Sequence, residues 1–449
     1  MKIKSLQIDA YRHLQNLHLD FTYPAGHDKA GQPLDKICII GQSATGKTSL
    51  LELVRDSFTQ LDDVEVINGH YIFKHFRLTF DGQLEFWKNG GALKIKAKKD
   101  SIFFNEQEFG NTSGNIGGFV EKLLSDDLKL LYLTTGLISK KLIDILNQNP
   151  LNILNELSKE QYAEFQKKYN RSSYIYEFNQ NSNEEVWFAL LYDTLDYRKR
   201  FTQMASELIN KGAIGDLAKL NREYATWATE NKNPLESFAK IFNPAIEKMY
   251  LEVDLINTEF LFPIKSHSKD EVIPTQSLST GTKGLLLSMF PLYTLDTNDA
   301  IILLDEPETS LYPDIQLDII KNYQSLAPGA QFIVATHSPL IASGFDPWEI
   351  VELKFNSEGN VYRELYYEGE NHVDNYKYNP RYMRWDDILQ RIFDMENDGS
   401  SLRKQKLDKL ATCNVKYKKL QKEDKAETED GKKILQEIQK LSKELSMWK

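Results

Sequence analysis

Two adjacent carboxylates, Asp305 and Glu306, follow the apolar run Ile301-Ile302-Leu303-Leu304. An unbroken apolar run of this kind is typical of a strand that is buried on both faces of a sheet. The two acids then lie at the carboxyl end of the strand, where open parallel sheets bind their ligands. There, Asp305 is expected to hold Mg²⁺ and Glu306 to polarise an attacking water molecule. The alternative is a buried strand that ends in a solvated acidic turn.

A second candidate for chemistry is the loop Gly41-Gln42-Ser43-Ala44-Thr45-Gly46-Lys47-Thr48. It follows an apolar run at 37–40 and precedes leucines at helical spacing, which predicts the order strand, loop and helix. In that context the pattern G-x-x-x-x-G-K-[ST] indicates a phosphate-binding loop, where backbone N–H groups and a helix N-terminus converge on phosphate. Lys47 is expected to reach the β- and γ-phosphates and Thr48 to bind Mg²⁺. The alternative is a glycine-rich turn that happens to contain a lysine.

Two further stretches carry groups that bind anions. Ser279-Thr280-Gly281-Thr282 precedes the apolar residues 285–290, as in an N-capped helix, and supplies hydroxyl groups and a helix N-terminus. Residues 331–335 predict another buried strand, which ends at Thr336-His337-Ser338. A histidine at the tip of the strand that follows the acidic pair is placed to hydrogen-bond a terminal phosphate. Taken alone, the first stretch is an ordinary helix cap and the second an ordinary histidine.

The composition is that of a globular protein, with 449 residues of which 41% are hydrophobic and 27% charged. No apolar run approaches the ~18 residues that span a bilayer and the N-terminus lacks a signal peptide's apolar stretch, so a cytoplasmic location is expected. The net charge of -10 argues against a protein that coats nucleic acid indiscriminately. Cys38 and Cys413 offer neither a metal-ligand spacing nor a disulfide framework.

Lysines concentrate in the chain after Ser401. Such a helix is usually a solvated face, and the alternative is a surface for nucleic acid or an acidic partner. Earlier in the chain, alternating apolar residues predict a β-hairpin at residues 3–21 and an antiparallel subsheet from 64 to 104. Residues 128–133 predict a core strand. Aromatic and leucine residues at three- and four-residue spacing predict an all-helical insertion at 139–252.

In this order the four stretches resemble the Walker A, signature, Walker B and switch motifs of ABC-type ATPases. Residues 1 to about 355 resemble the RecF/OLD-type ABC ATPases. The features that carry this resemblance are the four motifs, the N-terminal strand pair and Leu311-Tyr312-Pro313. Within that group the chain is similar to standalone ATPase subunits of bacterial antiphage systems, such as PtuA of Septu and AriA of PARIS. Thr280 and Thr282 replace a glycine and a glutamine of the transporter signature, as in the OLD-like subgroup. Tyr312 stands where OLD-like relatives often have histidine.

The resemblance implies an α/β fold with an ABC-type P-loop ATPase head, an antiparallel β subdomain, the helical insertion and C-terminal helices. Residues 1–138 form the N-terminal part of the head with Walker A, and 139–252 the insertion. Residues 253–370 form its C-terminal part with the signature, Walker B and switch histidine, and 371–449 a helical tail.

The resemblance also implies the ligands, ATP and Mg²⁺, and the role of each residue. Glu306 and His337 are expected to be catalytic, and Thr48 with Asp305 to bind Mg²⁺. The signature residues are expected to act in trans on the nucleotide of another subunit, so a homo-oligomer, a dimer or a multiple of dimers, is implied. The residues expected to bind the nucleotide are Gly41, Gln42, Ser43, Ala44, Thr45, Gly46, Lys47 and Thr48, and those acting in trans are Ser279, Thr280, Gly281 and Thr282.

The function implied is that of a slow, regulatory ATPase that controls a separate effector, a nuclease, in antiphage defence. OLD-like nucleases continue into a Toprim domain, which needs an early glutamate and a later D-x-D on a strand. Glu368-Gly369-Glu370 follows a predicted strand, but no such D-x-D comes after it, so any cutting is expected from a partner. The alternative is a RecF-like repair or loading ATPase whose ATP-closed dimer grips DNA. A transporter subunit fits neither the signature nor the tail.

Overall fold

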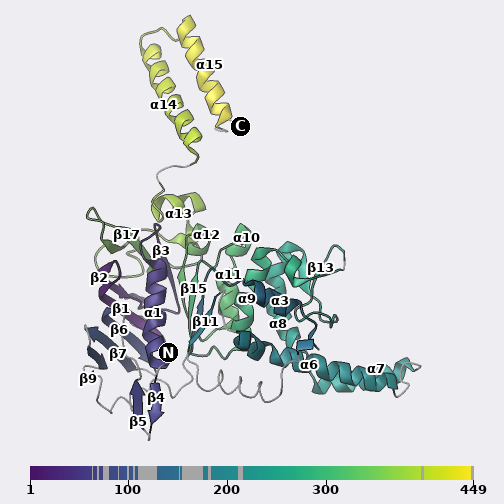
Figure 1. The fold of residues 1–449 in the computed structure, drawn as a ribbon. Helices are drawn as coiled ribbons and strands as arrows, with labels where there is room; N and C mark the ends of the chain where they lie inside the picture. Colours follow the sequence, from purple (N-terminus) through teal and green to yellow (C-terminus); the bar gives the residue numbers. More distant parts are fainter. Residues whose placement is uncertain are drawn as a thin grey trace. The chain divides into compact units, whose positions relative to one another are not determined.

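The computed structural model describes most of the chain as two compact units, Met1–Tyr382 and Met383–Lys449 (Figure 1). The subsheet predicted at 64 to 104 is described in part, and Leu128, at the start of a predicted core strand, lies outside the described residues. The described residues are 1–62, 64–67, 70–73, 80–88, 91–98, 101–104, 107–109, 129–150, 152–153, 175–179, 184–210, 216–269, 271–395 and 399–445.

An antiparallel sheet forms one layer of the first unit. Its strands β1 (Lys2–Tyr11) and β2 (Leu14–Asp20) make the predicted hairpin. Ile3 and Leu6 are both buried although they lie three residues apart, because a β-bulge between Ile3 and Ser5 shifts the alternation. The order is β2-β1-β6-β7-β8-β9, where the other strands are β6 (Asp81–Lys88), β7 (Gly91–Lys98), β8 (Ser101–Phe104) and β9 (Gln107–Phe109). A separate pair is made by β4 (Val64–Ile67) and β5 (His70–Phe73).

The central sheet has seven strands in the order β11-β10-β15-β16-β3-β17-β18. All neighbours run parallel except the edge strand β18, which pairs antiparallel with β17. Every residue of β15 is buried, as the apolar run predicts. The predicted α/β class with an antiparallel β subdomain is therefore confirmed. The strands are β3 (Lys36–Gly41), β10 (Leu130–Leu133), β11 (Ile175–Phe178), β15 (Ile301–Asp305), β16 (Gln331–Ala335), β17 (Ile350–Phe355) and β18 (Val361–Glu364).

The described part of the region predicted as an all-helical insertion includes a strand of the central sheet. Ile175–Phe178 forms β11, which joins β10 at the edge of the central sheet. Tyr176 and Phe178 are buried and Glu177 is exposed, a period of two that suits a strand rather than a helix. The rest of the described region is mainly helical, with α3 (Lys140–Asn147), α6 (Glu184–Asn210), α7 (Leu217–Glu230) and α8 (Pro234–Ile246).

The first unit also contains shorter elements. A three-stranded antiparallel sheet consists of β12 (Leu251–Val253), β13 (Ile264–Ser266) and β14 (Val272–Ile273). The helices around the central sheet are α1 (Lys47–Asp62), α9 (Thr280–Thr294), α10 (Pro313–Gln316), α11 (Ile319–Leu326) and α12 (Pro339–Ala342). No helix among the described residues is long and apolar enough to cross a membrane.

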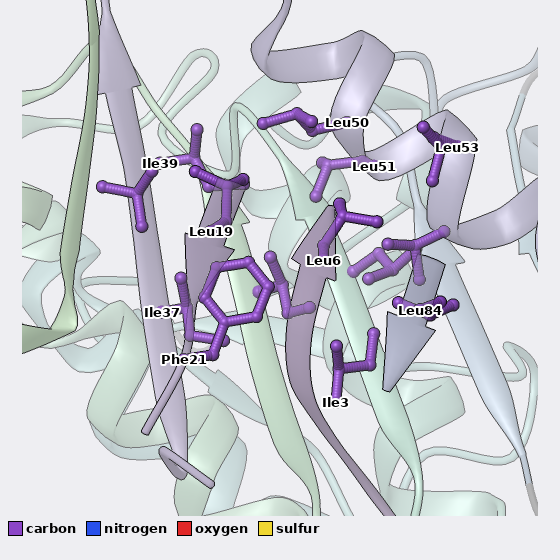
Figure 2. Packing of buried hydrophobic residues seen from close by; sticks show 14 of the residues in the cluster. Ile3, Leu6, Leu19, Phe21, Ile37, Ile39, Leu50, Leu51, Leu53 and Leu84 are labelled. Atoms are coloured by element: carbon purple, nitrogen blue, oxygen red, sulfur yellow. The ribbon is translucent and has the colours of Figure 1, made fainter. Parts of the chain in front are cut away.

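One hydrophobic core joins α1 to both sheets. Figure 2 shows Leu50, Leu51 and Leu53 of α1 packed among side chains of the antiparallel sheet and of β3. Leu6 and Ile39 are two of these partners, and all five side chains are buried. Burying one such side chain stabilises the fold by about 1.5–3 kcal/mol. The core therefore fixes the start of α1, and with it the loop that connects β3 to α1.

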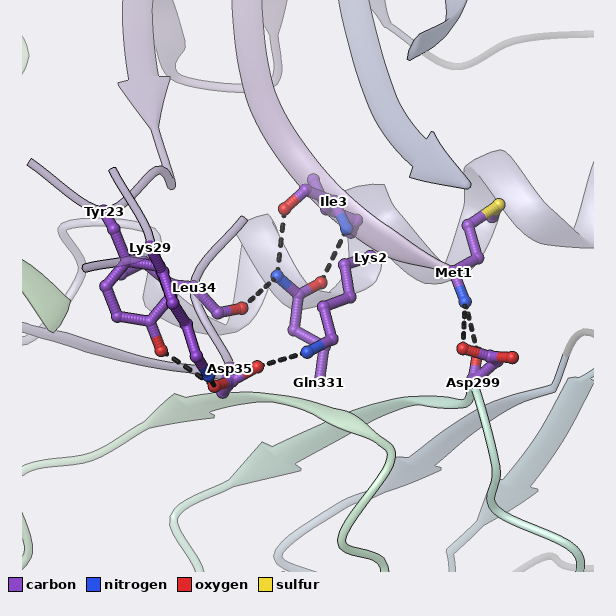
Figure 3. Close-up of polar contacts among 9 residues, drawn as sticks. All are labelled: Met1, Lys2, Ile3, Tyr23, Lys29, Leu34, Asp35, Asp299 and Gln331. Atoms are coloured by element: carbon purple, nitrogen blue, oxygen red, sulfur yellow. Dashed lines mark hydrogen bonds and ion pairs between the residues drawn. The ribbon is translucent and has the colours of Figure 1, made fainter. Parts of the chain in front are cut away.

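A buried amide, Gln331, links the two sheets at the amino end of β16 (Figure 3). Its Oε1 accepts a hydrogen bond from Ile3 N at 2.6 Å, and its Nε2 donates to Ile3 O at 2.9 Å and Leu34 O at 2.8 Å. Beside it, Asp35 accepts hydrogen bonds from Lys2, Tyr23 and Lys29. Because the buried amide is fully paired, it costs little to bury and fixes the register between the sheets.

The second unit contains the predicted C-terminal helices α13 (Trp385–Arg391), α14 (Ser401–Lys422) and α15 (Glu429–Glu444). Helices α14 and α15 pack against each other as an antiparallel hairpin. Lys406 Nζ and Glu444 Oε2 form an ion pair of 2.9 Å between them. The apolar stripe of α15 is thus covered by α14, through the buried residues Leu410, Ile438, Leu441 and Leu445.

Candidate active site

Three loops that are far apart in the sequence meet at the carboxyl edge of the central sheet. Strand β16 lies between β15 and β3, and all three run parallel. Gly41, Asp305 and Ala335 end these adjacent strands. The structure therefore brings together residues 41–48 (the P-loop), the acidic pair after β15 and residues 336–338 (the switch turn). Ligands of open α/β sheets bind at this kind of edge.

The P-loop backbone turns through three residues with positive φ, Gly41 at 149°, Ala44 at 67° and Gly46 at 93°. A Cβ on Gly41 would lie 2.3 Å from Leu353 O, and one on Gly46 would lie 2.9 Å from His13 Nε2. Both positions therefore require glycine. Helix α1 begins at Lys47, and the first backbone N–H groups of a helix have no partner within it. The loop thus presents N–H donors of the kind that bind phosphate.

Lys47 is a buried cation within the P-loop, with a relative exposure of 6%. Its Nζ donates hydrogen bonds to Gly41 O and Gln42 O, both at 3.0 Å. Burial lowers the pKa of the ammonium group, and the carboxylates of Glu306, Asp305 and Glu308 oppose this effect. The charge is thus partnered by neutral carbonyls and faced by acids at longer range. An anionic ligand would give it a stronger, charge-assisted partner.

Thr48 and Asp305 form the oxygen pair that the sequence predicts as Mg²⁺ ligands. Thr48 Oγ1 donates to Asp305 Oδ1 at 3.1 Å. Burial raises the pKa of the Asp305 carboxyl to about 6, although the hydrogen bond from Thr48 lowers it. A buried carboxylate of this kind gains from a nearby cation. Since protein-bound Mg²⁺ usually takes one or two protein oxygens and fills its shell with water and phosphate, the pair fits this ion.

Among the described residues, no group of three or more His, Cys, Asp or Glu side chains is arranged so that it could hold a metal ion.

Glu306 and His337 face each other across the mouth of the site, with Glu306 Oε1 3.8 Å from His337 Nε2. Both side chains are partly open, with exposures of 42% and 40%. Glu306 has a φ of 48°, which turns the chain sharply at the end of β15, while its N–H donates to Ala335 O at 2.8 Å. Burial and the charge of Lys47 lower the pKa of His337, and the nearby Glu306 does not outweigh them. At neutral pH the imidazole is therefore neutral, with one donor and one acceptor nitrogen.

Glu308 is a third acid of the site, and its role cannot be read from the motif. Its Oε1 accepts hydrogen bonds from Thr336 Oγ1 at 2.7 Å and from His337 N at 2.8 Å. It thereby ties the segment after β15 to the switch turn. The only sequence signal is that Glu308 lies two residues after Glu306.

Residues 279–282 (the signature turn) cap α9, as predicted. Ser279 Oγ accepts a hydrogen bond from Thr282 N at 3.1 Å, and the two hydroxyl oxygens lie 2.7 Å apart. Thr282 Oγ1 also contacts Met249 Sδ at 3.2 Å. Gly281 packs on the segment after Walker B, because a Cβ there would lie 2.5 Å from Ser310 O. These hydrogen bonds do not involve the P-loop, and Ser279 and Thr280 are exposed.

A cavity of about 170 Å³ lies between the signature turn and the acidic pair. Thr280, Asp305 and Glu306 line it, together with Thr134 and Thr135, which directly follow β10. These two threonines belong to no motif. The signal that could have found them is their place after a buried strand parallel to β15, since such loops share one edge of the sheet.

The turn of the N-terminal hairpin also lies beside the P-loop. Arg12 has a φ of 51° and pairs with Glu52 of α1, and its Nη1 lies 3.4 Å from Ser49 Oγ. The imidazole of His13 lies against Gly46. A hairpin turn carries no motif of its own, so this proximity is visible only in the fold.

Residues 1–342 match the AAA ATPase domain family. Three solved structures are similar at low identity. An SMC head bound to the C-winged helix domain of ScpA has 12% identity and a TM-score of 0.41, over 81% of this chain and 97% of that chain. An SMC head domain with an extended coiled coil, bound to the C-terminal domain of ScpA from Pyrococcus furiosus, has 12% identity and a TM-score of 0.39, over 81% and 96%. The SMC head domain from Thermotoga maritima has 10% identity and a TM-score of 0.38, over 81% and 99%.

The family match covers well over half of the 449 residues and includes the P-loop, the signature turn, Asp305, Glu306 and the switch turn. The chain therefore belongs to the AAA ATPase domain family.

Proposed function

We propose that this protein binds ATP with Mg²⁺ at the carboxyl edge of the central sheet and hydrolyses it to ADP and phosphate. One observation carries the proposal. Three adjacent parallel strands bring together Lys47, the Thr48–Asp305 pair and the Glu306–His337 pair at one edge of the sheet. This combination supplies a phosphate cradle, a metal pair and a base, which together are the parts that phosphoryl transfer to water requires.

Each residue has a distinct part in this proposal. The backbone of the P-loop encloses the phosphates, and Lys47 exchanges its carbonyl partners for phosphate oxygens. Thr48 and Asp305 hold the Mg²⁺, which when bound neutralises phosphate charge. Glu306 accepts the proton of the attacking water, and His337 donates a hydrogen bond to the terminal phosphate.

The proposed site is composite, so that a second copy of the chain completes it through its signature turn. The exposure of Ser279 and Thr280, and the location of the hydrogen bonds of Ser279 and Thr282 away from the P-loop, support this arrangement. A helix N-terminus with hydroxyl groups suits a phosphate presented by another subunit. The active form is accordingly a homodimer or a multiple of dimers.

Mixing two inactive variants is expected to restore activity if the site is composite. Lys47→Ala removes the P-loop lysine, and Ser279→Arg blocks the signature turn. Each variant alone should be inactive, but a mixed dimer contains one intact site. Random exchange between equal amounts should therefore restore about a quarter of the parental ATP hydrolysis. The measurement is steady-state phosphate release after subunit exchange.

Ser277→Arg, an exposed serine just before the signature turn, is the matched control and should keep its activity. Subunit exchange must be demonstrated separately with tagged copies. Mixtures that exchange subunits and still release no phosphate would argue for a site complete within one chain.

The proposed role of slow ATP turnover is to control a separate effector, a nuclease, in antiphage defence. This part rests on the resemblance to RecF/OLD-type ATPases that stand alone in such systems. It is supported by the region after β18, where Glu368 and Glu370 lie in an irregular exposed segment and Glu368 pairs with Lys377 at 2.8 Å. That setting differs from the strand-borne acids of a Toprim metal site.

A RecF-like ATPase that binds DNA is the second candidate, because α14 is strongly basic. Its 22 residues include eight lysines or arginines and one aspartate. A basic helix of this kind suits a phosphate backbone. DNA-stimulated turnover that falls steeply with salt concentration would favour this function over control of an effector protein.

Deleting residues 401–449 is expected to separate ATP hydrolysis from control of the effector. The hairpin has its own small core of Leu410, Ile438, Leu441 and Leu445, and the core around α1 includes no residue of 401–449. The rate of ATP hydrolysis should stay within about twofold of the parental rate, because changes at distant, independent sites have little effect on each other. Co-purification with the product of the neighbouring gene and protection against phage should both be lost.

Retained co-purification would instead move the docking site to the helical region. There α7 exposes apolar side chains, with Leu217 at 72%. Loss of ATP hydrolysis would mark the tail as part of the ATPase or of its oligomer contacts.

A further inference from the structure

Two side chains fasten the switch turn to the segment that follows Walker B. The first is Glu308, whose Oε1 accepts from both Thr336 Oγ1 and His337 N. The second is Gln316, whose Oε1 accepts from Ser338 Oγ at 2.6 Å. Every residue of the switch turn therefore contacts the segment at 308–316 through a side chain or its backbone N–H. No residue of the P-loop takes part in these hydrogen bonds.

The bonds of Gln316 continue along the same segment. Its Nε2 donates to Leu311 O at 2.9 Å, next to Ser310, whose carbonyl oxygen lies against Gly281. Within the turn, Ser338 N donates to Thr336 Oγ1 at 2.9 Å. A continuous chain of contacts thus runs from the switch turn, through the segment after Walker B, to the signature turn.

We infer that Glu308 and Gln316 are positioning residues that hold His337 opposite Glu306. The inference rests on the proposed ATP hydrolysis and assigns a role to residues outside its catalytic set. His337 lies on the surface end of a turn and is 40% exposed, so packing alone does not fix it. The hydrogen bond from its own backbone N–H to Glu308 fixes the backbone from which the imidazole extends.

The geometry also separates Glu308 from the role of a base. Both bonds to the switch turn use Oε1, and the second oxygen, Oε2, is buried without a hydrogen-bond partner. A base must reach water, and Glu306 with an exposure of 42% does. Because Oε2 makes no bond, an amide group can replace the carboxylate while the acceptor at Oε1 is kept.

This difference gives a discriminating pair of variants, Glu308→Ala and Glu308→Gln. The alanine variant loses the acceptor for two bonds, whereas the glutamine variant keeps it. Hydrogen exchange of the peptide that contains residues 336–338 reads the contact directly, because His337 N–H is one of the donors. Exchange of this peptide should be faster in the alanine variant and parental in the glutamine variant.

Kinetics supply the second measurement. For Glu308→Ala, kcat is expected to fall roughly 10- to 100-fold, the range that follows from losing a buried hydrogen-bond acceptor, while KM for ATP stays within about threefold. Glu308→Gln should restore kcat to near the parental value. Gln316→Ala, which loses the other link, should change exchange and kcat in the same direction. Glu364→Ala removes a half-buried carboxylate on β18 that accepts from Tyr362 and pairs with Lys354, away from the switch turn, and is the matched control.

The outcomes separate this inference from the function on which it rests. Unchanged exchange in both Glu308→Ala and Gln316→Ala overturns it, whether or not the protein hydrolyses ATP. If exchange of the 336–338 peptide is faster but kcat is parental, the contacts exist but do not position His337 for catalysis. That result also overturns the inference. A loss of kcat in Glu308→Gln equal to that in Glu308→Ala would give Glu308 a charge-dependent role instead. A parental protein without ATP hydrolysis refutes the proposed function and removes the positioning role with it.

Discussion

Replacing Lys47 with alanine is expected to abolish ATP binding. The lysine holds a positive charge inside the P-loop, and its Nζ bonds two loop carbonyls. Its removal leaves three carboxylates, Asp305, Glu306 and Glu308, without the cation that faces them. A triphosphate would then meet uncompensated negative charge, and affinity should fall at least about 100-fold from the loss of charge-assisted bonds. Titration with a fluorescent ATP analogue in the presence of Mg²⁺ measures this.

The matched control is Lys321→Ala, which removes an exposed lysine from α11. It should bind the analogue with parental affinity. The melting temperature of Lys47→Ala must be recorded, because the two bonds to Gly41 and Gln42 also shape the loop. A folded Lys47→Ala protein with unchanged affinity would remove the P-loop assignment.

The sequence is sufficient for the strands that carry the site. Strands β3, β15 and β16 each contain an unbroken apolar run of four residues, since both faces of a central parallel strand are covered. Each is followed directly by residues that can bind phosphate or metal. Parallel order then places these residues at one edge, so the meeting of Lys47, Asp305 and His337 could be expected before the fold was known.

Short strands at the sheet edge are harder to predict. Strand β11 has four residues and lies among helices, so its period of two is outweighed by the helical spacing around it. The β-bulge after Ile3 likewise breaks the simple alternation of β1. In both cases the pairing partner decides the local structure, and that partner is distant in sequence.

Side-chain contacts between distant segments are also absent from the sequence pattern. The hydrogen bond that Thr336 donates to Glu308 joins segments that follow two different strands, and no spacing rule relates them. The contact between Gly281 and Ser310 depends on how α9 approaches β15. Similarly, α14 covers the apolar stripe of α15, and no spacing in the sequence of α15 identifies α14 as the partner.

Replacing Glu306 with glutamine is expected to keep ATP binding and stop hydrolysis. The amide has the shape of the carboxylate, and the backbone bond from residue 306 to Ala335 O does not depend on the side chain. Glutamine cannot accept the proton of the attacking water, because a neutral amide is a very weak base. Loss of a general base typically costs 10²- to 10⁴-fold, so kcat should fall by about that factor while affinity for ATP stays near parental.

Single-turnover hydrolysis together with nucleotide titration measures both quantities on one preparation. Since the interface would form but the nucleotide would not be cleaved, the Glu306→Gln protein should accumulate as an ATP-bound assembly, visible by size-exclusion chromatography with light scattering. Glu358→Gln, in the exposed turn between β17 and β18, is the matched control. If Glu306→Gln turns over ATP at the parental rate, the base lies elsewhere. Glu308 is then the next acid to test, and its bonds to Thr336 and His337 would have to open for it to reach water.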